Sequence, residues 1–306
     1  MRVFESFNEA KGKIKNAVVT TGSFDGVHIG HKEIIKHLND LSKQINGESV
    51  LITFYPHPRK VLYPEQNDLK LINSKSEKIE LLQKTGLNNL IIVPFTLDFS
   101  KTTSHDFIVK YLLGNLNTRI IVIGHNYQFG HKRQGDNTYL HDLAQKMNFR
   151  VEEIPLKGVK NETISSTKIR KILHKGNIQQ ANNYLGHQFF ISGIIKQTDK
   201  MPEVNNSEVF ELIIEEQDKL IPPPGIYAIK LFCKGSYMKG MAIIYNTDNQ
   251  ELKIRINLLF NDFKEDNVRG VLYFYRKIKT GNIFSDTTNS DKELILARDE
   301  IKGEEF

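Results

Sequence analysis

The chain has 306 residues, 39% of them hydrophobic and 25% charged, with a formal net charge of +6. This length is about twice that of a common domain and predicts two domains, and the composition is ordinary for a globular protein. The sequence has no apolar run long enough to span a membrane, no secretory signal at its start, and only one cysteine, Cys233, which excludes an intrachain disulfide. We therefore expect a cytoplasmic protein without a membrane partner.

The charge is unevenly distributed along the chain. Residues 1–185 carry 26 Lys/Arg and 17 Asp/Glu, a net charge of +9, whereas residues 186–306 carry 16 and 19, a net charge of −3. A basic N-terminal half suits polyanionic ligands, either nucleotides or nucleic acid, but a solvated lysine-rich surface gives the same count. Charge therefore leaves these alternatives open.

Apolar β-branched runs alternate with helical patterns in the first part of the chain. The runs that predict strands are 16–21, 49–54, 89–95 and 119–124, with 150–155 as a weaker edge strand. Two short helices, 166–174 and 178–185, are expected to close this part. Strand–helix alternation predicts an α/β fold with a doubly wound, mainly parallel, Rossmann-like sheet, whose ligands bind at the carboxyl ends of the strands.

From Gly186 the pattern changes to short alternating segments separated by turn residues. These segments are 189–197, 208–216, 225–233, 237–245, 251–260 and 270–278, and a terminal helix is expected at 291–301. They predict a small antiparallel β-barrel or sandwich. We therefore expect two domains, 1–185 and 186–306.

The segment TGSFDGVHIGH, Thr21–His31, follows the first of these strands directly and leads into a helix. Its three glycines let the backbone turn tightly and approach a ligand, and a helix N-terminus is a ready anion site. His28 and His31 are three residues apart and project toward the same side, where two imidazoles can donate to phosphate oxygens. We therefore predict phosphate binding here rather than a plain turn with two satisfied histidines.

Two further segments carry residues suited to a nucleotide site. In TFYPHP, residues 53–58, the prolines hold the chain extended, which suits a wall against a flat ring. In ISSTKIR, residues 164–170, three hydroxyl side chains stand at a helix N-terminus with Arg170 one turn on. This second pattern is either an ordinary N-cap or part of a phosphate clamp.

A longer polar segment, GHNYQFGHKRQGD, follows the strand at 119–124. Within it, Phe129 can stack on an aromatic ligand and Arg133 can hold a phosphate in a bidentate grip. Asn126 can donate to a phosphate oxygen. The segment is therefore a third candidate for ligand contact.

The string GSFDGVHIGH resembles the N-terminal signature of bacterial bifunctional riboflavin kinase/FAD synthetases, members of the HxGH nucleotidyltransferase superfamily. The resemblance continues in family order through TFYPHP, VPFTLDFS, GHNYQFGHKRQGD and ISSTKIR, and covers residues 16–186. Asn126 stands where the family often has aspartate, and a neutral amide still suits phosphate contact. The resemblance implies transfer of AMP from ATP to FMN, with Mg²⁺ accompanying ATP and no metal site in the protein itself.

The resemblance also implies three sets of site residues. The catalytic set is His28, His31, Asn126 and Arg170. The ATP-binding set is Gly22, Ser23, Phe24, Asp25, Gly26, Gly30, Ser165, Ser166 and Thr167. The FMN-binding set is Pro56, His57, Pro58, Phe129, Arg133 and Asp136. No protein nucleophile is needed, because an FMN phosphate oxygen attacks the α-phosphorus of ATP directly, and positioning with charge stabilisation supplies the acceleration.

The C-terminal part departs from the family, whose second domain is a riboflavin kinase barrel. Where the family has GRxxGFPTAN, the stretch Lys196–Leu212 has no glycine and no Pro-Thr pair. Counting back from Asp262 places Asn257 where the family's catalytic glutamate belongs; Arg255 is the nearest alternative, and Glu251 needs another register. An amide cannot act as a base. We therefore expect a degenerate barrel without kinase activity.

Three other hypotheses stay open. The chain is a full bifunctional enzyme if the kinase residues are misaligned. It is a non-catalytic flavin-nucleotide sensor or scaffold if only binding is retained, although a pure binder needs no α-phosphate clamp. An RNA-binding function rests on the basic half alone, with no aromatic-basic signature to support it. We expect ATP and FMN as partners and no nucleic acid, and the sequence does not give the oligomeric state.

Overall fold

A computed structural model describes residues 1–66, 69–124, 128–154, 158–159, 162–201, 207–259, 263, 265–281 and 290–303. The chain forms two compact units. Unit 1 comprises Met1–Leu69 and Lys78–Ile164, and unit 2 comprises Lys70–Glu77 and Ser165–Phe306. This division follows contacts alone, so the functional boundary expected between residues 185 and 186 stays a prediction.

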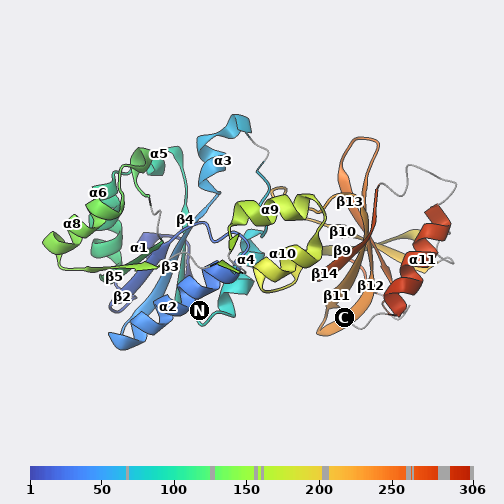
Figure 1. Cartoon of the computed structure of the whole chain (residues 1–306), viewed down its shortest axis with the longest axis horizontal. Helices are drawn as coiled ribbons and strands as arrows, with labels where there is room; N and C mark the ends of the chain where they lie inside the picture. The colour runs from blue at the N-terminus through green and yellow to red at the C-terminus, as the bar shows by residue number, and fades with distance from the viewer. Residues whose placement is uncertain are drawn as a thin grey trace. The chain divides into compact units, whose positions relative to one another are not determined.

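Unit 1 is built on a six-stranded, wholly parallel sheet (Figure 1). The strand order is β1-β4-β3-β2-β5-β6. The strands are β1 (Arg2–Phe4), β2 (Ala17–Thr21), β3 (Glu48–Tyr55), β4 (Asn89–Pro94), β5 (Thr118–Gly124) and β6 (Arg150–Ile154). The expected parallel sheet and its five strands are confirmed, with β6 at an edge. The sequence analysis missed β1, because three residues are too few to show an apolar period.

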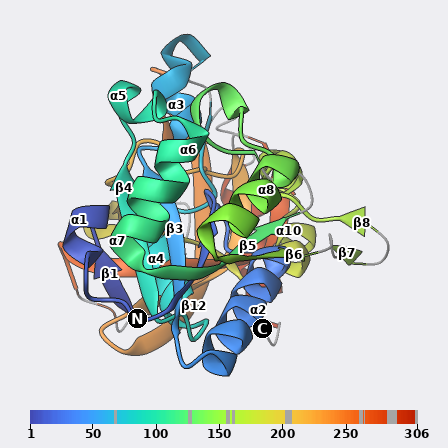
Figure 2. The same cartoon turned by 90° about the vertical axis from the view of Figure 1, so that its left-hand side faces the viewer.

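Helices lie over this sheet (Figure 2), and their apolar side chains form a core with those of the strands. One core joins Val19 and Ile121 of the inner strands to Phe107 and Leu140 of the helices. The helical elements are α1 (Phe7–Ala10), α2 (Ile29–Gln44), α3 (Pro58–Leu62), η1 (Pro64–Gln66), α5 (Leu97–Ser100), α6 (Ser104–Asp106), η2 (Phe107–Leu113), α7 (Gly114–Leu116), η3 (His131–Arg133) and α8 (Asn137–Met147). A small hairpin, β7 (Gly158–Val159) with β8 (Glu162–Thr163), follows, and α4 (Lys75–Gln83) begins in unit 2 and continues in unit 1.

The strand order reverses between β2 and β5. From β2 the chain moves outward through β3 and β4, and it then returns to add β5 on the other side of β2. In an open parallel sheet, the carboxyl ends of the strands at such a reversal flank a crevice in which ligands bind. The segments that follow β2 and β5 are 21–31 and 124–136, so the fold starts two of the predicted motifs at this edge.

Unit 2 is built on a closed antiparallel barrel, with helices beside it (Figure 1). The strand order is β10-β13-β12-β11-β14-β9. The strands are β9 (Phe189–Met201), β10 (Ser207–Ile213), β11 (Gly225–Cys233), β12 (Ser236–Asn246), β13 (Leu252–Leu258) and β14 (Val268–Thr280). The helices are α9 (Ser166–His174), α10 (Ile178–Leu185) and α11 (Ser290–Lys302). All six expected strands and all three helices are confirmed, and closure leaves no free sheet edge.

Helix α11 covers part of the outside of the barrel. Its residues Leu294, Ala297 and Ile301 form one core with barrel residues such as Val209 and Met241. The barrel wall is therefore buried on two faces at this position. This explains why its strands carry consecutive apolar residues rather than alternating apolar and polar ones.

Candidate functional site

The turn between β2 and α2, here called the HxGH turn (Thr21–His31), is the centre of the candidate site. The amide of Gly22 donates to the carbonyl of Ile52 at 3.0 Å, which ties the start of the turn to β3. Phe24, Gly26 and Val27 then have positive φ angles of 45°, 88° and 38°. Glycine suits 88° because a side chain is strained there, whereas Phe24 and Val27 are buried and held by packing. The predicted strand–turn–helix arrangement is confirmed.

His28 and His31 lie against each other, on one side of the helix start, as expected. His28 caps the N-terminus of α2, where its Nδ1 accepts from the backbone amide of His31 at 3.3 Å. The two imidazole rings are stacked, with centroids 3.6 Å apart and an interplanar angle of 16°. Because Nδ1 accepts, a neutral His28 carries its proton on Nε2, which is then a donor. A Cβ at Gly30 would press on the His28 ring at 3.3 Å.

The surroundings of the His31 imidazole disfavour its charged form. Burial of the ring lowers the pKa of His31 well below 6.5, and the charges of His28 and Lys78 lower it further. The Phe24 ring lies over it, with centroids 4.5 Å apart. Within the described part of the chain, Nδ1 of His31 is buried and has no hydrogen-bond partner. A ligand that brings a polar group to this nitrogen would remove the cost of leaving it unpaired.

Other members of the predicted ATP-binding set divide by exposure. Phe24 and Asp25 are buried, with 3% and 1% of their surfaces exposed, and they shape the turn from inside. Gly22, Ser23 and Gly30 are half-buried and lie at its surface. The half-buried residues are therefore the part of the turn that a ligand can reach. The buried side chains of Phe24 and Asp25 stabilise the turn instead.

Lys78 is a candidate site residue that the sequence analysis missed. Its Nζ donates to the carbonyl of Ser23 at 2.7 Å, and the hydroxyl of Thr53 donates to the same oxygen at 3.2 Å. These two bonds fix the HxGH turn from α4 and from β3. Lys78 is 55 residues from Ser23 and stands in a helical pattern with no motif, so no local signal marks it.

The TFYPHP segment follows β3, the neighbour of β2 in the sheet. The Tyr55-Pro56 peptide is cis, and Nδ1 of His57 accepts from the amide of Arg59 at 3.2 Å, which caps α3. Pro58 is the first residue of α3 rather than part of an extended wall, and this corrects the expectation. A proline fits there because the first helical residue needs no amide donor and its fixed φ is already helical.

In the segment after β5, Phe129 belongs to the core of unit 1. Its ring is 7% exposed, with centroids 6.3 Å from those of Phe107 and Tyr139. The expected contact of this ring with the flavin stays a prediction. Asp136 caps α8, its carboxylate accepting from the amide of Tyr139 at 2.8 Å. Two predicted residues of this segment lie outside the described residues: Asn126 and the side chain of Arg133.

The ISSTKIR segment begins α9 in unit 2. The hydroxyl of Ser165 accepts from the amide of Lys168 at 3.3 Å, so the N-cap is confirmed. Nη2 of Arg170 donates to Oγ1 of Thr167 at 3.2 Å, and Ser166 is the first helical residue. An N-cap and an anion site are compatible, because both use the unpaired amides of a helix start.

The described residues contain neither a membrane-spanning helix nor a cluster of metal-binding side chains. None of the described helices is long and apolar enough to cross a membrane. No group of three or more His, Cys, Asp or Glu side chains among them has the arrangement of a metal site. Cys233 is buried, and burial raises the pKa of its thiol.

Comparisons with known proteins agree on one family. A family model described as FAD synthetase matches residues 10–168. The chain is 34% identical over 241 residues to the FAD synthetase of Listeria monocytogenes serovar 1/2a, covering 79% of this chain and 88% of the relative. It is 32% identical to the bifunctional riboflavin kinase/FMN adenylyltransferase of the same organism, covering 80% and 78%. It is 28% identical to the bifunctional enzyme of Buchnera aphidicola subsp. Acyrthosiphon pisum, covering 96% and 94%.

One solved structure supports the fold. A crystal structure described as a macrolide-efflux protein from Streptococcus pneumoniae matches with a TM-score of 0.86 over 100% of both chains, at 23% identity. At this identity the match establishes the order of a parallel-sheet unit and a barrel, and nothing about activity.

We expect Lys78→Met to raise the pKa of the His31 imidazole, because it removes a positive charge that disfavours protonation. Burial and His28 remain, so the pKa should stay below 6.5. NMR titration of histidine ring protons measures it. The control Lys84→Met removes a surface lysine paired with Glu80 and should leave His31 unchanged. An identical His31 titration in Lys78→Met would contradict the described contact.

Proposed function

The chain belongs to the FAD synthetase family, and we propose that it transfers the AMP unit of ATP to FMN, giving FAD and pyrophosphate. The observation that carries the proposal is the stacked pair of His28 and His31 at the N-terminus of α2, directly after an inner strand of a parallel sheet. The names of the relatives, FAD synthetase and bifunctional riboflavin kinase/FMN adenylyltransferase, agree with it.

The reaction is a single displacement at phosphorus. A phosphate oxygen of FMN forms a bond to the α-phosphorus of ATP while the bond from that phosphorus to the bridging oxygen breaks, and the bridging oxygen leaves with pyrophosphate. The attacking phosphate is already ionised at neutral pH, so no base is required. The work of the protein is to position the reactants and to stabilise negative charge on the phosphate oxygens.

Three groups of the HxGH turn suit that work. The start of α2 directs unpaired amides and a positive dipole end toward an anion. The Nε2 proton of His28 is a donor whose tautomer is fixed by the bond at Nδ1. The surroundings of His31 favour its neutral form, which presents a donor without the tight water shell of a charged group. Together they are arranged before the substrate binds.

The remaining roles come from the family resemblance. We assign the ATP phosphates also to Ser165, Ser166, Thr167, Arg170 and Asn126. We assign the flavin side to Pro56, His57, Pro58, Arg133 and Asp136. Mg²⁺ is proposed to enter bound to ATP, as part of that substrate, and to neutralise the charge of the departing pyrophosphate.

The purified full chain should convert FMN and ATP with Mg²⁺ to FAD and pyrophosphate in equal amounts. Chromatographic separation of the flavins with a pyrophosphate assay measures both products. Chelation of Mg²⁺ should stop the reaction, because the metal-bound triphosphate is the proposed substrate. Recovery of all FMN unchanged, with enzyme, ATP and Mg²⁺ in excess, would sink the proposal.

Replacing either histidine of the turn should lower turnover far more than FMN binding. We expect His28→Ala and His31→Ala each to reduce kcat by a factor of about a hundred to a thousand, or about 2.7–4 kcal/mol, because each removes a donor facing charge that grows in the transition state. Steady-state kinetics and FMN titration separate the two effects. His141→Ala, on the exposed face of α8, is the control and should behave as the unaltered protein. Near-normal turnover of either turn variant would exclude that histidine from the mechanism.

We also propose that the barrel does not phosphorylate riboflavin. Asn257, which stands where the family's base is expected, is fully buried, and its amide donates to the carbonyl of Glu208 at 3.3 Å. The guanidinium of Arg255 lies over the ring of Tyr245, 5.2 Å from its centroid. Neither side chain is a base. Two parts of the kinase alignment lie outside the described residues: Asp262 and residues 202–206. The names of the bifunctional relatives favour the alternative, in which kinase activity is retained.

The full chain given riboflavin, ATP and Mg²⁺ should form no FMN, while the same preparation converts FMN to FAD. The expected reason is the missing carboxylate base. Chromatography of the flavins measures both reactions in parallel. FMN formation above the enzyme-free blank would refute the proposal, and a loss of that activity in Glu251→Gln would identify the base under a different register.

A further inference from the structure

Unit 2 carries a row of aromatic side chains that the proposed chemistry does not use. The pairing of β9, β14, β11 and β12 brings these residues together. Ring centroids lie 5.5 Å apart between Phe190 and Tyr273 and 6.0 Å apart between Tyr273 and Tyr237. The ring of Phe232 lies 4.7 Å from that of Tyr237. The four rings therefore form one continuous row, although each comes from a different strand.

The row lies on the outside of the barrel. Along β12, Tyr237 is on the same face as Met241, which forms a core with α11 on the outer side of the barrel. Tyr237 is 62% exposed, and Tyr273 and Phe232 are half-buried. The ring of Phe274, which points the other way in β14, is fully buried. A ligand can therefore reach the outer rings beside the part of the wall that α11 covers.

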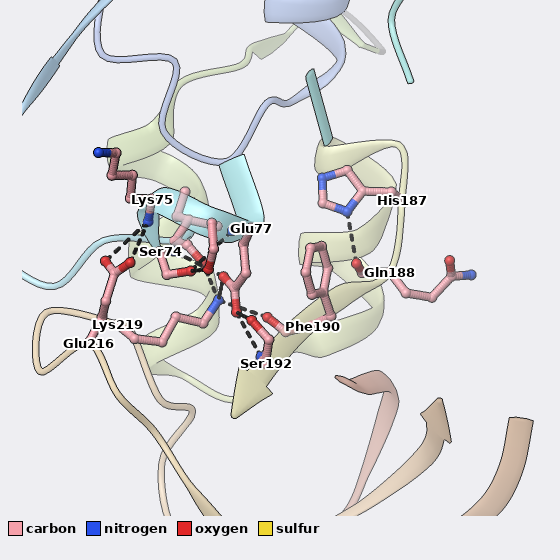
Figure 3. A network of polar contacts seen from close by, with 11 residues as sticks. Ser74, Lys75, Glu77, His187, Gln188, Phe190, Ser192, Glu216 and Lys219 are labelled. Carbon is pink, nitrogen blue, oxygen red and sulfur yellow. Dashed lines mark hydrogen bonds and ion pairs between the residues drawn. The ribbon is translucent and has the colours of Figure 1, made fainter. Parts of the chain in front are cut away.

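One end of the row is closed by a network of polar contacts (Figure 3). Phe190 is 2% exposed, and its ring meets that of His187 edge-on, with centroids 6.1 Å apart. The carbonyl of Phe190 accepts from Nζ of Lys219 at 2.7 Å. Lys219 in turn pairs with Glu77 at 2.6 Å, and both of these side chains are 1% exposed. This end is therefore held by buried contacts, and a ligand meets only the other three rings.

Two lysines stand beside the open rings. The pairing register places Lys230 directly opposite Tyr273 on one side and opposite Lys239 on the other. The strands that carry the open rings, β11, β12 and β14, contain no Asp or Glu. Arg269 is paired with Glu215 from outside these strands at 2.9 Å, so the charge beside the rings comes from Lys230 and Lys239. This part of the surface is therefore positive, although residues 186–306 together carry a net charge of −3.

We infer that this surface, here called the aromatic face, binds single-stranded nucleic acid. Its residues are Lys230, Phe232, Tyr237, Lys239 and Tyr273. Rings in succession suit unpaired bases, each of which has a flat face to stack, and the lysines suit the phosphates between the bases. The outside of a barrel is convex, whereas small molecules bind in concave sites, so an extended ligand fits this face better than a free flavin. A second copy of the chain fits it poorly, because two such faces would bring like charges together.

This inference departs from the expectation that the chain has no nucleic-acid partner. The sequence shows no aromatic-basic signature because the residues of the aromatic face come from three strands and meet only in the folded barrel. The inference also differs from the RNA-binding hypothesis that rests on the basic residues 1–185, since it concerns unit 2 alone. It is independent of the function proposed for unit 1 and requires no kinase chemistry in the barrel.

Binding of a labelled single-stranded RNA of about twelve nucleotides to the full chain tests the inference, with fluorescence anisotropy as the measurement. We expect a Kd between about 1 and 100 µM at physiological salt, which is usual for binding without sequence preference. Binding weaker than this range overturns the inference.

Two variants locate the binding on the aromatic face. Tyr237→Ser removes the most exposed ring and should raise the Kd by between about fivefold and a hundredfold, the range expected for the loss of one base–aromatic stack. The double variant Lys230→Gln/Lys239→Gln should lower the slope of log Kd against log salt concentration by about 1.4, because each phosphate contact to a single strand contributes about 0.7.

Two matched controls remove similar side chains of unit 2 outside the aromatic face. Leu296→Ser removes an apolar side chain that is 69% exposed on α11, and Lys253→Gln removes a lysine of β13. Both should bind the RNA as the unaltered protein does. Circular dichroism and thermal unfolding establish that each variant is folded.

Photocrosslinking with 4-thiouridine in the RNA, followed by mass spectrometry, identifies the contact directly. We expect crosslinks at Tyr237 or Tyr273. Crosslinks confined to unit 1 overturn the inference, as does RNA binding that is unaltered in both folded variants of the aromatic face. Binding of phosphatidylserine vesicles that is lost in Tyr237→Ser, with no binding of RNA, also overturns it and assigns the face to a membrane surface.

Discussion

The reversal of strand order between β2 and β5 is the constraint on which the rest of unit 1 depends. Parallel strands cannot be joined by tight hairpins, so each connection returns across a face of the sheet and every strand ends at the same edge. The strands at the reversal are β2 and β5, and in open parallel sheets the connections that leave such strands turn toward opposite faces. The HxGH turn starts there, and its first amide bond is to β3. Because the sheet starts the segments after β2 and β5 at one edge, a ligand site there can be built from these two segments.

The two histidines that we propose to face the phosphates differ in their surroundings. The Nδ1 of His28 accepts from the amide of His31, so a neutral His28 carries its proton on Nε2. His31 is enclosed against Phe24 and under the influence of Lys78, so the charged form of the ring is disfavoured. A neutral, desolvated imidazole keeps little water to be displaced when a phosphate arrives. The positive charge that the phosphates require can come instead from the helix start and from groups that stay charged at any relevant pH.

The elements were predictable where the physical cause is local. Buried strands appeared as apolar runs, and α9 and α10 have the predicted bounds because a serine cap begins the first and Gly186, in the left-handed region, ends the second. The rest depends on contacts that a linear pattern does not contain. The polar motif around Phe129 gave no sign that its neighbours in space are Phe107 and Tyr139. Lys78 was missed because its partner Ser23 is 55 residues away.

The surroundings of Asn257 distinguish what keeps the barrel folded from what a kinase base at this position would need. Its amide donates to the carbonyl of Glu208. A carboxylate has no hydrogen to donate unless it is protonated, so an ionised glutamate at this position would leave that carbonyl unpaired and would bury a charge. The contact with the Glu208 carbonyl therefore suits a neutral donor, whereas a catalytic base must be ionised and must reach the substrate hydroxyl. The fold itself makes no such demand: apolar burial between the strands and under α11 maintains the barrel.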